Sequence, residues 1–284
     1  MISQRWPAPA KINLFLHFVG QRSDGYHLLQ THFQFLDYGD ELDFEVTGDG
    51  QITRVNDLAG VPDEQDLVVR AARALQPYAS GGAGVAINVN KLLPAGGGLG
   101  GGSSDAATTL VALNELWSTR LTQAELAKLG LALGADVPVF VHGHAAFAEG
   151  VGEQLTPLEA SQGPVLVVYP GGLVSTTEIF SHPELTRDTP TIRIHDLTSS
   201  KLTNDCENVT RQLHPVVGRA LDWLGQFADA RMSGTGACVF AAFESISKAE
   251  QVAEQMPEQW VWFVAERRNT SPLIDKLAAS GRHD

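Results

Sequence analysis

The chain of 284 residues is poor in cysteine and contains no long apolar run. Its two cysteines, Cys206 and Cys238, are too few for a disulfide framework and suit a reducing compartment. No uninterrupted apolar stretch approaches the length of a membrane span, and the N-terminal residues lack the architecture of a signal peptide. We therefore expect a cytoplasmic protein that has no membrane partner.

Basic residues are also scarce, because 20 Lys and Arg stand against 33 Asp and Glu, for a net charge of −13. This balance argues against the broad basic surface that nucleic acids and anionic membranes require. It still allows a small anionic ligand to be held by local backbone dipoles. No His, Cys and Asp cluster has the spacing of a structural zinc site, so no structural zinc is expected and no residue is assigned as a metal ligand. For the oligomeric state we expect a monomer or a weak homodimer.

Strand-like and helix-like patterns intermix along the chain without a regular βαβ alternation. Strands are predicted at 10–20, 31–46, 84–94, 164–170, 231–243 and 259–266. Helices are predicted at 63–79, 104–117, 122–134 and 247–256, the third with Thr122 as its cap. These patterns predict an α+β fold in two lobes, residues 1–155 and 156–284, in which the final residues pack back on the first lobe.

A glycine-rich stretch, "LPAGGGLGGGSSDAA" at residues 93–107, follows a predicted strand and precedes a predicted helix. The N-terminus of a helix carries unpaired N–H groups and partial positive charge, so it attracts phosphate. Glycines let several N–H groups converge without a Cβ in the way. We predict a phosphate-binding loop rather than a flexible linker, with the helix cap among Ser103, Ser104 and Asp105.

Three familiar phosphate loops fit this stretch poorly. A Walker A loop needs a lysine directly after its last glycine, but Ser103 follows Gly102. A dinucleotide fingerprint would place its acidic residue at Glu115, within a predicted helix rather than after the next strand. A protein-kinase loop would need catalytic-loop and metal-binding motifs downstream, and neither is present.

Two further stretches join the glycine loop: "PAPAKINLFL" at residues 7–16 and "MSGTGACVF" at residues 232–240. Together the three resemble the motifs of the GHMP kinase superfamily, which includes galactose, homoserine, mevalonate and phosphomevalonate kinases. The extra glycines, with "RSDGYHLLQT", "GADVPVF" and "NDCENV", resemble the branch of the non-mevalonate isoprenoid pathway. The resemblance covers residues 7 to about 245.

The resemblance implies a two-lobed GHMP kinase fold, with ATP bound by the N-terminal lobe and the active site in the cleft between the lobes. It implies transfer of the γ-phosphoryl group of ATP to the 2-hydroxyl of a small-molecule substrate, a cytidine diphosphate derivative of methylerythritol. Mg²⁺ is expected to arrive with ATP, held largely by phosphate oxygens and water. Whether Ser103 or Ser104 completes its shell stays open.

The same resemblance assigns the site residues. It implies that Lys11 reaches the acceptor hydroxyl and the transferring group, and that Asp136 accepts the hydroxyl proton or only orients it. Taken alone, Lys11 reads as an edge charge and Asp136 as a polar turn residue. The ATP-binding residues are Pro94, Ala95, Gly96, Gly97, Gly98, Leu99, Gly100, Gly101, Gly102, Ser103 and Ser104. The substrate-binding residues are Asn13, Tyr26, His27, Thr176, Phe180, Gly234 and Thr235.

Within this set, Tyr26 and Phe180 are expected to clamp the cytosine ring, while His27 contacts its polar edge. For Phe180, a place in the apolar core is nearly as good an interpretation. Three alternatives for the whole chain stay open: a GHMP kinase for another alcohol, a nucleotide-binding sensor without catalysis, and a nicotinamide-dependent oxidoreductase. Retention of both Lys11 and Asp136 argues against the sensor.

Overall fold

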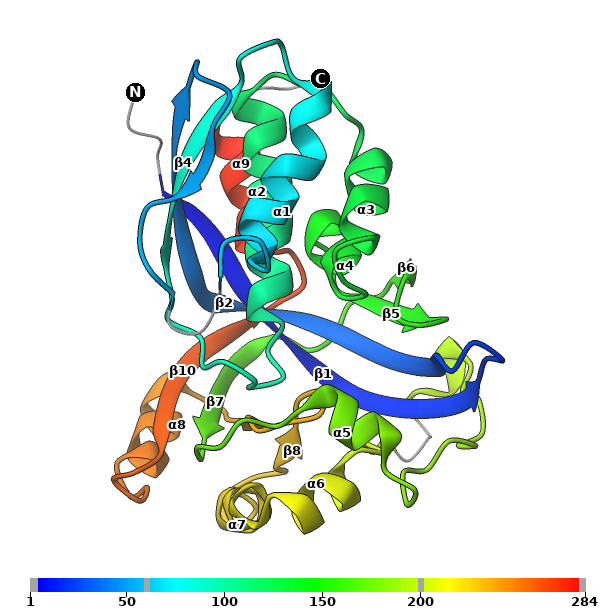
Figure 1. Cartoon of the computed structure of the whole chain (residues 1–284). Helices are drawn as coiled ribbons and strands as arrows, with labels where there is room; N and C mark the ends of the chain where they lie inside the picture. The colour runs from blue at the N-terminus through cyan, green and yellow to red at the C-terminus, as the bar shows by residue number, and fades with distance from the viewer. Residues whose placement is uncertain (1–4, 59–61, 199–201, 281–284) are drawn as a thin grey trace.

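Two long antiparallel strands, β1 (Trp6–Gln21) and β2 (His27–Thr47), cross the computed structural model as a continuous ribbon (Figure 1). A turn at Asp24 and Gly25 joins them. Nearly all of β1 is buried, so it is covered on both faces. Its register against β2 shifts just before Lys11, again after Asn13, and once more after Phe18. Such irregularities re-aim side chains and recur beside active sites.

The remaining strands extend this pair into one sheet of ten strands within the described residues 5–58, 62–198 and 202–280. They are β3 (Ile52–Arg54), β4 (Gly84–Asn90), β5 (Ala146–Glu149), β6 (Gln154–Pro157), β7 (Gly163–Tyr169), β8 (Arg231–Met232), β9 (Val239–Ala242) and β10 (Val261–Arg268). The main path runs β3-β4-β2-β10-β7-β9-β8. Because β10 pairs with both β2 and β7, the sheet continues from the first half of the chain into the second.

Helices gather at the two ends of this sheet (Figure 1). One group comprises α1 (Leu67–Leu75), α2 (Gly101–Leu116), α3 (Gln123–Leu131), α4 (Val137–His142) and α9 (Pro272–Ala279). The other comprises α5 (Thr176–Ser181), α6 (Glu207–Leu213), α7 (Pro215–Leu224) and α8 (Ile246–Ala253). Short 3₁₀ turns lie at Gln76–Tyr78 and Ile194–Asp196. Within the described residues, no helix has the length and apolar character needed to cross a bilayer.

In the part of the chain that the structure describes, three hydrophobic clusters form the core. The first lies between β1, β2 and β4 and the helices α1, α2 and α4, and it includes Leu273 of α9. The second lies between β7, β9 and the helices α7 and α8. The third is a small cluster between them, in which Leu99 of the glycine loop packs with Ile12 and Cys238. The glycine loop is therefore anchored by core side chains from both halves of the chain.

This architecture confirms the α+β prediction. The division into lobes at residue 155 stays a proposal: residues 155 and 156 lie inside β6, which pairs with β5. The lobe ends at residues 1–4 and 281–284 lie outside the described residues. Leu273 places α9 against the first cluster, as expected if the final residues return to the first lobe. The predicted strand at 231–243 is two short strands, β8 and β9, joined by the glycine turn.

Candidate active site

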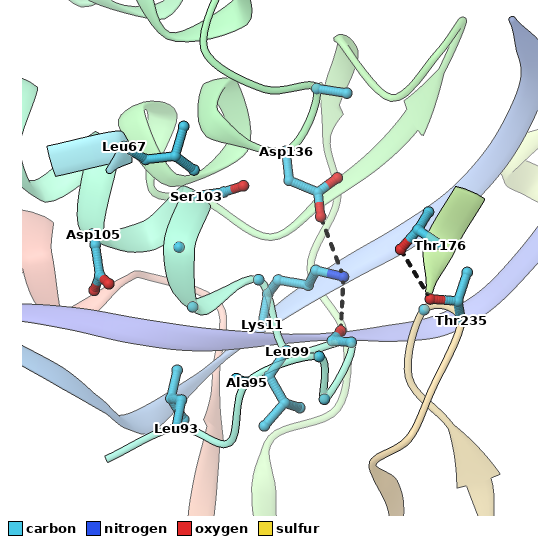
Figure 2. Close-up of a pocket in the computed structure, with 18 of the residues that line it drawn as sticks. Lys11, Leu67, Leu93, Ala95, Leu99, Ser103, Asp105, Asp136, Thr176 and Thr235 are labelled. Carbon is cyan, nitrogen blue, oxygen red and sulfur yellow. Dashed lines mark hydrogen bonds and ion pairs between the residues drawn. The ribbon is translucent and has the colours of Figure 1, made fainter. Parts of the chain in front are cut away.

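A cavity of about 830 Å³ opens where β1, the glycine loop, the start of α4 and the turn after β8 meet (Figure 2). This volume is typical of sites for small ligands. Lys11, Asp136, Thr176 and Thr235 line it, together with the loop from Pro94 to Ser103. Residues that lie more than 200 positions apart in the chain thus share one site.

The carbonyl oxygens of the glycine loop point back toward the protein. Those of Gly96 and Gly97 accept hydrogen bonds from the backbone N–H groups of Ala237 and Cys238, at 3.0 and 3.1 Å. The glycine turn of the third motif thus pairs with the loop of the second through backbone contacts. Each motif therefore helps to hold the other in place.

The two following carbonyls bind the first motif. The Gly98 oxygen accepts from Lys11 Nζ at 3.0 Å and from Ser233 Oγ at 2.9 Å. The Leu99 oxygen accepts from the backbone N–H of Lys11 at 2.9 Å. Gly98 has a φ of +72°, and a Cβ built on it would lie 2.1 Å from the Ser233 carbonyl oxygen. The close approach between the loop and the turn therefore requires glycine at this position.

The backbone N–H groups of the loop, unlike its carbonyls, are left without protein partners in the part of the chain that the structure describes. From Gly98 to Ser103, no backbone N–H donates a hydrogen bond to any described residue. All six of these residues line the cavity. A run of unsatisfied donors that leads into a helix N-terminus is the arrangement that binds phosphate oxygens.

Helix α2 begins at Gly101, with Gly100 as its N-cap in the left-handed conformation and no side-chain cap. The predicted cap among Ser103, Ser104 and Asp105 is therefore wrong, because these residues already lie in the first turns. Ser103 lines the cavity. Ser104 is fully buried, and its hydroxyl has no partner among the described residues.

Lys11 lies at the centre of the cavity wall (Figure 2). Its side chain is only 4% exposed, and Nζ lies 2.7 Å from Asn13 Oδ1 and 3.4 Å from Asp136 Oδ2. With the Gly98 carbonyl, these oxygens surround the buried ammonium, as a charge inside a protein requires. Asp136 immediately precedes α4 and keeps 34% of its side chain exposed, so its carboxylate remains accessible from the cavity.

The turn of the third motif contributes Gly234 and Thr235 to the cavity wall. Thr235 Oγ1 lies 3.2 Å from Thr176 Oγ1, the first residue of α5 (Figure 2). Asn204 supports the turn from behind, because its Nδ2 donates to the Met232 and Gly234 carbonyls at 2.9 and 2.8 Å. Asn204 therefore has a structural role in this turn.

A second cavity of about 700 Å³ adjoins the first and shares Leu29, Ala135, Val151 and Phe180 with it. Tyr26 and His27 line this second cavity. Tyr26 is 61% exposed. Phe180 belongs to a cluster of three rings, with centroids 5.1 Å from Phe18 and 5.3 Å from His27. Phe180 therefore packs against the second core cluster and also lines both cavities. The aromatic clamp stays a prediction.

Sequence reasoning missed an ionic cluster beside the helix N-terminus. Lys91, just after β4, binds the carboxylates of Asp40 and Asp105, the latter at 2.7 Å. Burial raises the pKa of Asp105 to about 7, against the opposing effect of Lys91. Burial alone would lower the pKa of Lys91, but the two carboxylates raise it above its ordinary value. The sequence signal that could have indicated this cluster is Lys91 itself, a lone lysine between a predicted strand and the glycine loop.

Comparisons with known proteins agree with this geometry. The chain matches the families described as "GHMP kinases N terminal domain" at residues 66–144 and "GHMP kinases C terminal" at residues 192–261. It is 56% identical over 97% of its length to the 4-diphosphocytidyl-2-C-methyl-D-erythritol kinase of Nitrosococcus oceani, of which 99% is covered. It is 55% identical over 98% of its length to the enzyme of that name from Halorhodospira halophila, of which 97% is covered.

Solved structures agree as well. A crystal structure of 4-(cytidine 5'-diphospho)-2C-methyl-D-erythritol kinase matches with a TM-score of 0.80 and 31% identity, covering 93% of this chain and 99% of that one. A mevalonate kinase matches with a TM-score of 0.67 at 16% identity over 95% of this chain and 100% of that one, and shares the fold. The chain is a GHMP kinase. Within that superfamily it belongs to the family of the 4-diphosphocytidyl-2-C-methyl-D-erythritol kinases.

Proposed function

We propose that this protein transfers the γ-phosphoryl group of ATP to the 2-hydroxyl of 4-diphosphocytidyl-2-C-methyl-D-erythritol, in the non-mevalonate route to isoprenoid precursors. The observation that carries the proposal is the continuity of the two cavities. A loop with unsatisfied amides and a ring-lined pocket meet on either side of Lys11 and Asp136. A phosphate donor and a nucleoside-bearing acceptor would therefore meet at these two residues.

The donor side of the proposal rests on the glycine loop. The free N–H groups from Gly98 to Ser103 would bind the ATP phosphates, helped by the dipole of α2. Apolar side chains of Leu67 and Leu93 line the cavity on the side away from Thr176 and suit the adenosine end (Figure 2). Local backbone dipoles would thus bind a polyanion on a chain whose net charge is −13.

Mg²⁺ fits the site as an ion that is bound with the nucleotide. Among the described residues, no group of three or more His, Cys, Asp and Glu side chains is arranged to hold a metal. Ser103 and Asp136 are among the hard oxygen ligands that line the cavity, and phosphate oxygens and water would supply the rest. The ion would offset charge on the phosphates when bound.

The acceptor hydroxyl would lie between Lys11 and Asp136. The Asp136 carboxylate would accept its proton or hold it in line, since phosphoryl transfer needs position more than a strong base. The Lys11 ammonium, fixed by Asn13 and Gly98, would stabilise negative charge on the acceptor oxygen and the transferring group. Because Lys11 is held by the fold before substrate binds, it needs no reorganisation during the reaction.

The cytidine end would occupy the second cavity. Tyr26 and Phe180 would stack on the base, and His27 would contact its polar edge. Asn13, Thr176, Gly234 and Thr235 would contact the part of the substrate between the base and the reacting hydroxyl. We further propose a cytoplasmic enzyme that binds no nucleic acid and acts as a monomer or weak homodimer. The two buried thiols and the acidic composition support the first two points.

A panel of acceptors tests the substrate directly. ADP release is measured with ATP and Mg²⁺ in the presence of the cytidyl substrate, mevalonate, galactose or homoserine. We expect kcat/KM for the cytidyl substrate to exceed that for each other acceptor by at least about a thousandfold, because the site would leave polar groups unpaired around the wrong acceptor. A preference for any of the other three would refute the proposed substrate.

A further inference from the structure

Arg187 joins the two sides of the second cavity. Its Nη2 donates to the Phe180 and His182 carbonyls at 2.7 and 2.9 Å, and its Nη1 donates to the Leu185 carbonyl at 3.0 Å. Its Nε donates to Nε2 of His27 at 2.9 Å. Among the described residues it pairs with no carboxylate. The guanidinium is therefore fixed by backbone carbonyls, and its fork directs one N–H at the imidazole.

This contact determines where the proton of His27 lies. An arginine N–H is always a donor, because the guanidinium does not lose its proton in proteins. Nε2 of His27 must then be the acceptor, and the neutral ring carries its hydrogen on Nδ1. Burial and the Arg187 charge lower the pKa of His27, so the neutral ring is favoured. Nδ1 has no hydrogen-bond partner among the described residues.

We propose that Arg187 is a positioning residue for base selection: it holds His27 as an Nδ1–H donor, which favours cytosine over uracil. This inference rests on the proposed function and deepens it. Stacking on aromatic rings does not separate the two pyrimidines, because every base has a π-face. Cytosine N3 is an acceptor, whereas uracil N3 carries a hydrogen. A fixed donor facing that edge pairs with cytosine and meets a second donor in uracil.

Loss of Arg187 therefore has a specific chemical consequence. A neutral imidazole without that partner can take either tautomer. In the Nε2–H form, Nδ1 becomes an acceptor, which suits the N3–H of uracil. Removal of Arg187 should relax base selection rather than only weaken binding. A lysine at this position is also a donor only, so it should preserve much of the selection.

Two measurements test the proposal, and neither depends on phosphoryl transfer. The first is calorimetric binding of CDP and UDP to the full chain, with a non-hydrolysable ATP analogue in the phosphate loop. We expect the wild type to bind CDP at least about tenfold more tightly than UDP, the scale of one discriminating hydrogen bond. Arg187→Met should reduce that ratio to within about threefold, and Arg187→Lys should retain most of it.

The second measurement is long-range ¹H–¹⁵N NMR of the histidine rings, with His27 assigned by comparison with His27→Gln. The wild type should show the Nδ1–H tautomer, and Arg187→Met should show a change. Arg267→Met is the matched control, because Arg267 also donates to backbone carbonyls, those of Gly163 and Gln162, but does not line the second cavity. It should leave the tautomer and the CDP to UDP ratio unchanged.

An Nε2–H tautomer in the wild type would overturn the proposal even if no variant folds. An equal affinity for CDP and UDP in the wild type would also overturn it, as would a ratio that survives Arg187→Met. Failure of the proposed function looks different. In that case the acceptor panel shows another substrate, while the His27 tautomer and the base preference are still measured.

Discussion

Replacing Gly98 with alanine tests whether the close approach of the glycine loop to the third motif maintains the site. Gly98 has a φ of +72°, and its Cβ would lie 2.1 Å from the Ser233 carbonyl oxygen and 2.9 Å from that of Gly236. Gly50→Ala is a matched control. Gly50 has a φ of +73°, but a Cβ there would meet no atom within 4 Å. Both variants therefore place an alanine in the left-handed region, but only Gly98→Ala brings its Cβ into overlap with neighbouring backbone atoms.

The expected difference can be worked out from these contacts. An alanine in the left-handed region costs about 1–2 kcal/mol, and this cost applies to both variants. In Gly98→Ala the loop and the turn must also separate by more than about 1 Å to relieve the overlap. That movement strains the bonds that the Gly98 carbonyl accepts from Lys11 and Ser233. Each buried group left unpaired costs about 1–3 kcal/mol, so we expect about 2–4 kcal/mol of destabilisation beyond the control.

Urea unfolding and steady-state kinetics are the assays. Since Lys11 shifts with the loop, we expect kcat/KM of Gly98→Ala to fall by about a hundredfold, the usual effect of a 1 Å misplacement of reacting groups. Gly50→Ala should keep its activity within about threefold. A Gly98→Ala variant as stable and as active as Gly50→Ala would refute the idea that the loop and the turn hold each other in place.

Two further predictions concern stability. Burial lowers the pKa of His32, whose Nε2–H donates to the Leu158 carbonyl at 2.9 Å. The unfolded chain therefore binds a proton below about pH 6.5 that the folded chain resists, so this group reduces stability as pH falls, by at most about 1.4 kcal/mol per pH unit. His32→Gln keeps a donor and should make the free energy of unfolding fall less steeply between pH 7 and 5; an unchanged slope would contradict this. Leu273→Ala, at 1% exposure in the first core cluster, should cost about 2–5 kcal/mol in urea unfolding, whereas a loss below about 0.5 kcal/mol would show that α9 does not dock there.

The parts of the fold that sequence predicts best depend on neighbouring residues. Thr122 and Glu125 form a capping box at the start of α3, with the Glu125 N–H donating to Thr122 Oγ1 at 3.3 Å and the Glu125 carboxylate accepting in return. The structure confirms the predicted cap at Thr122. The sequence could predict it because all the residues that form this helix start lie within four positions of one another. The Asp24 and Gly25 turn between β1 and β2 is local in the same way.

The start of α2 shows where local rules fail. Asp105 is a good N-cap by type, but in the structure its carboxylate binds Lys91, which also binds Asp40 of β2. The Asp105 side chain is thus engaged in a tertiary contact. Gly100, in the left-handed conformation, is the N-cap of the helix instead. At the start of α1, Asp66 caps the helix and the other nearby acidic residues precede it, so none of them lies in the first turn.

The site residues likewise depend on contacts between distant parts of the chain, which local sequence patterns do not predict. Lys11 and Asp136 lie on a strand and before a short helix, and no periodicity relates them; resemblance to known motifs brought them together. The structure then places their charged atoms 3.4 Å apart. Arg187 had no such signal, because it lies in a polar stretch without a motif. Its role depends on three carbonyls and one imidazole that only the folded chain assembles.

The central claim is that Asp136 and Lys11 act on the acceptor hydroxyl while the glycine loop binds ATP. The most direct measurement compares Asp136→Asn with the wild type, in turnover of the cytidyl substrate and in ATP binding. Asn keeps the shape of the side chain but accepts a proton poorly, so kcat should fall by at least about a hundredfold while the Kd of ATP stays within about threefold. Asp275→Asn, in a surface pair with Arg268, is the control. Turnover of Asp136→Asn close to that of the wild type would contradict the account.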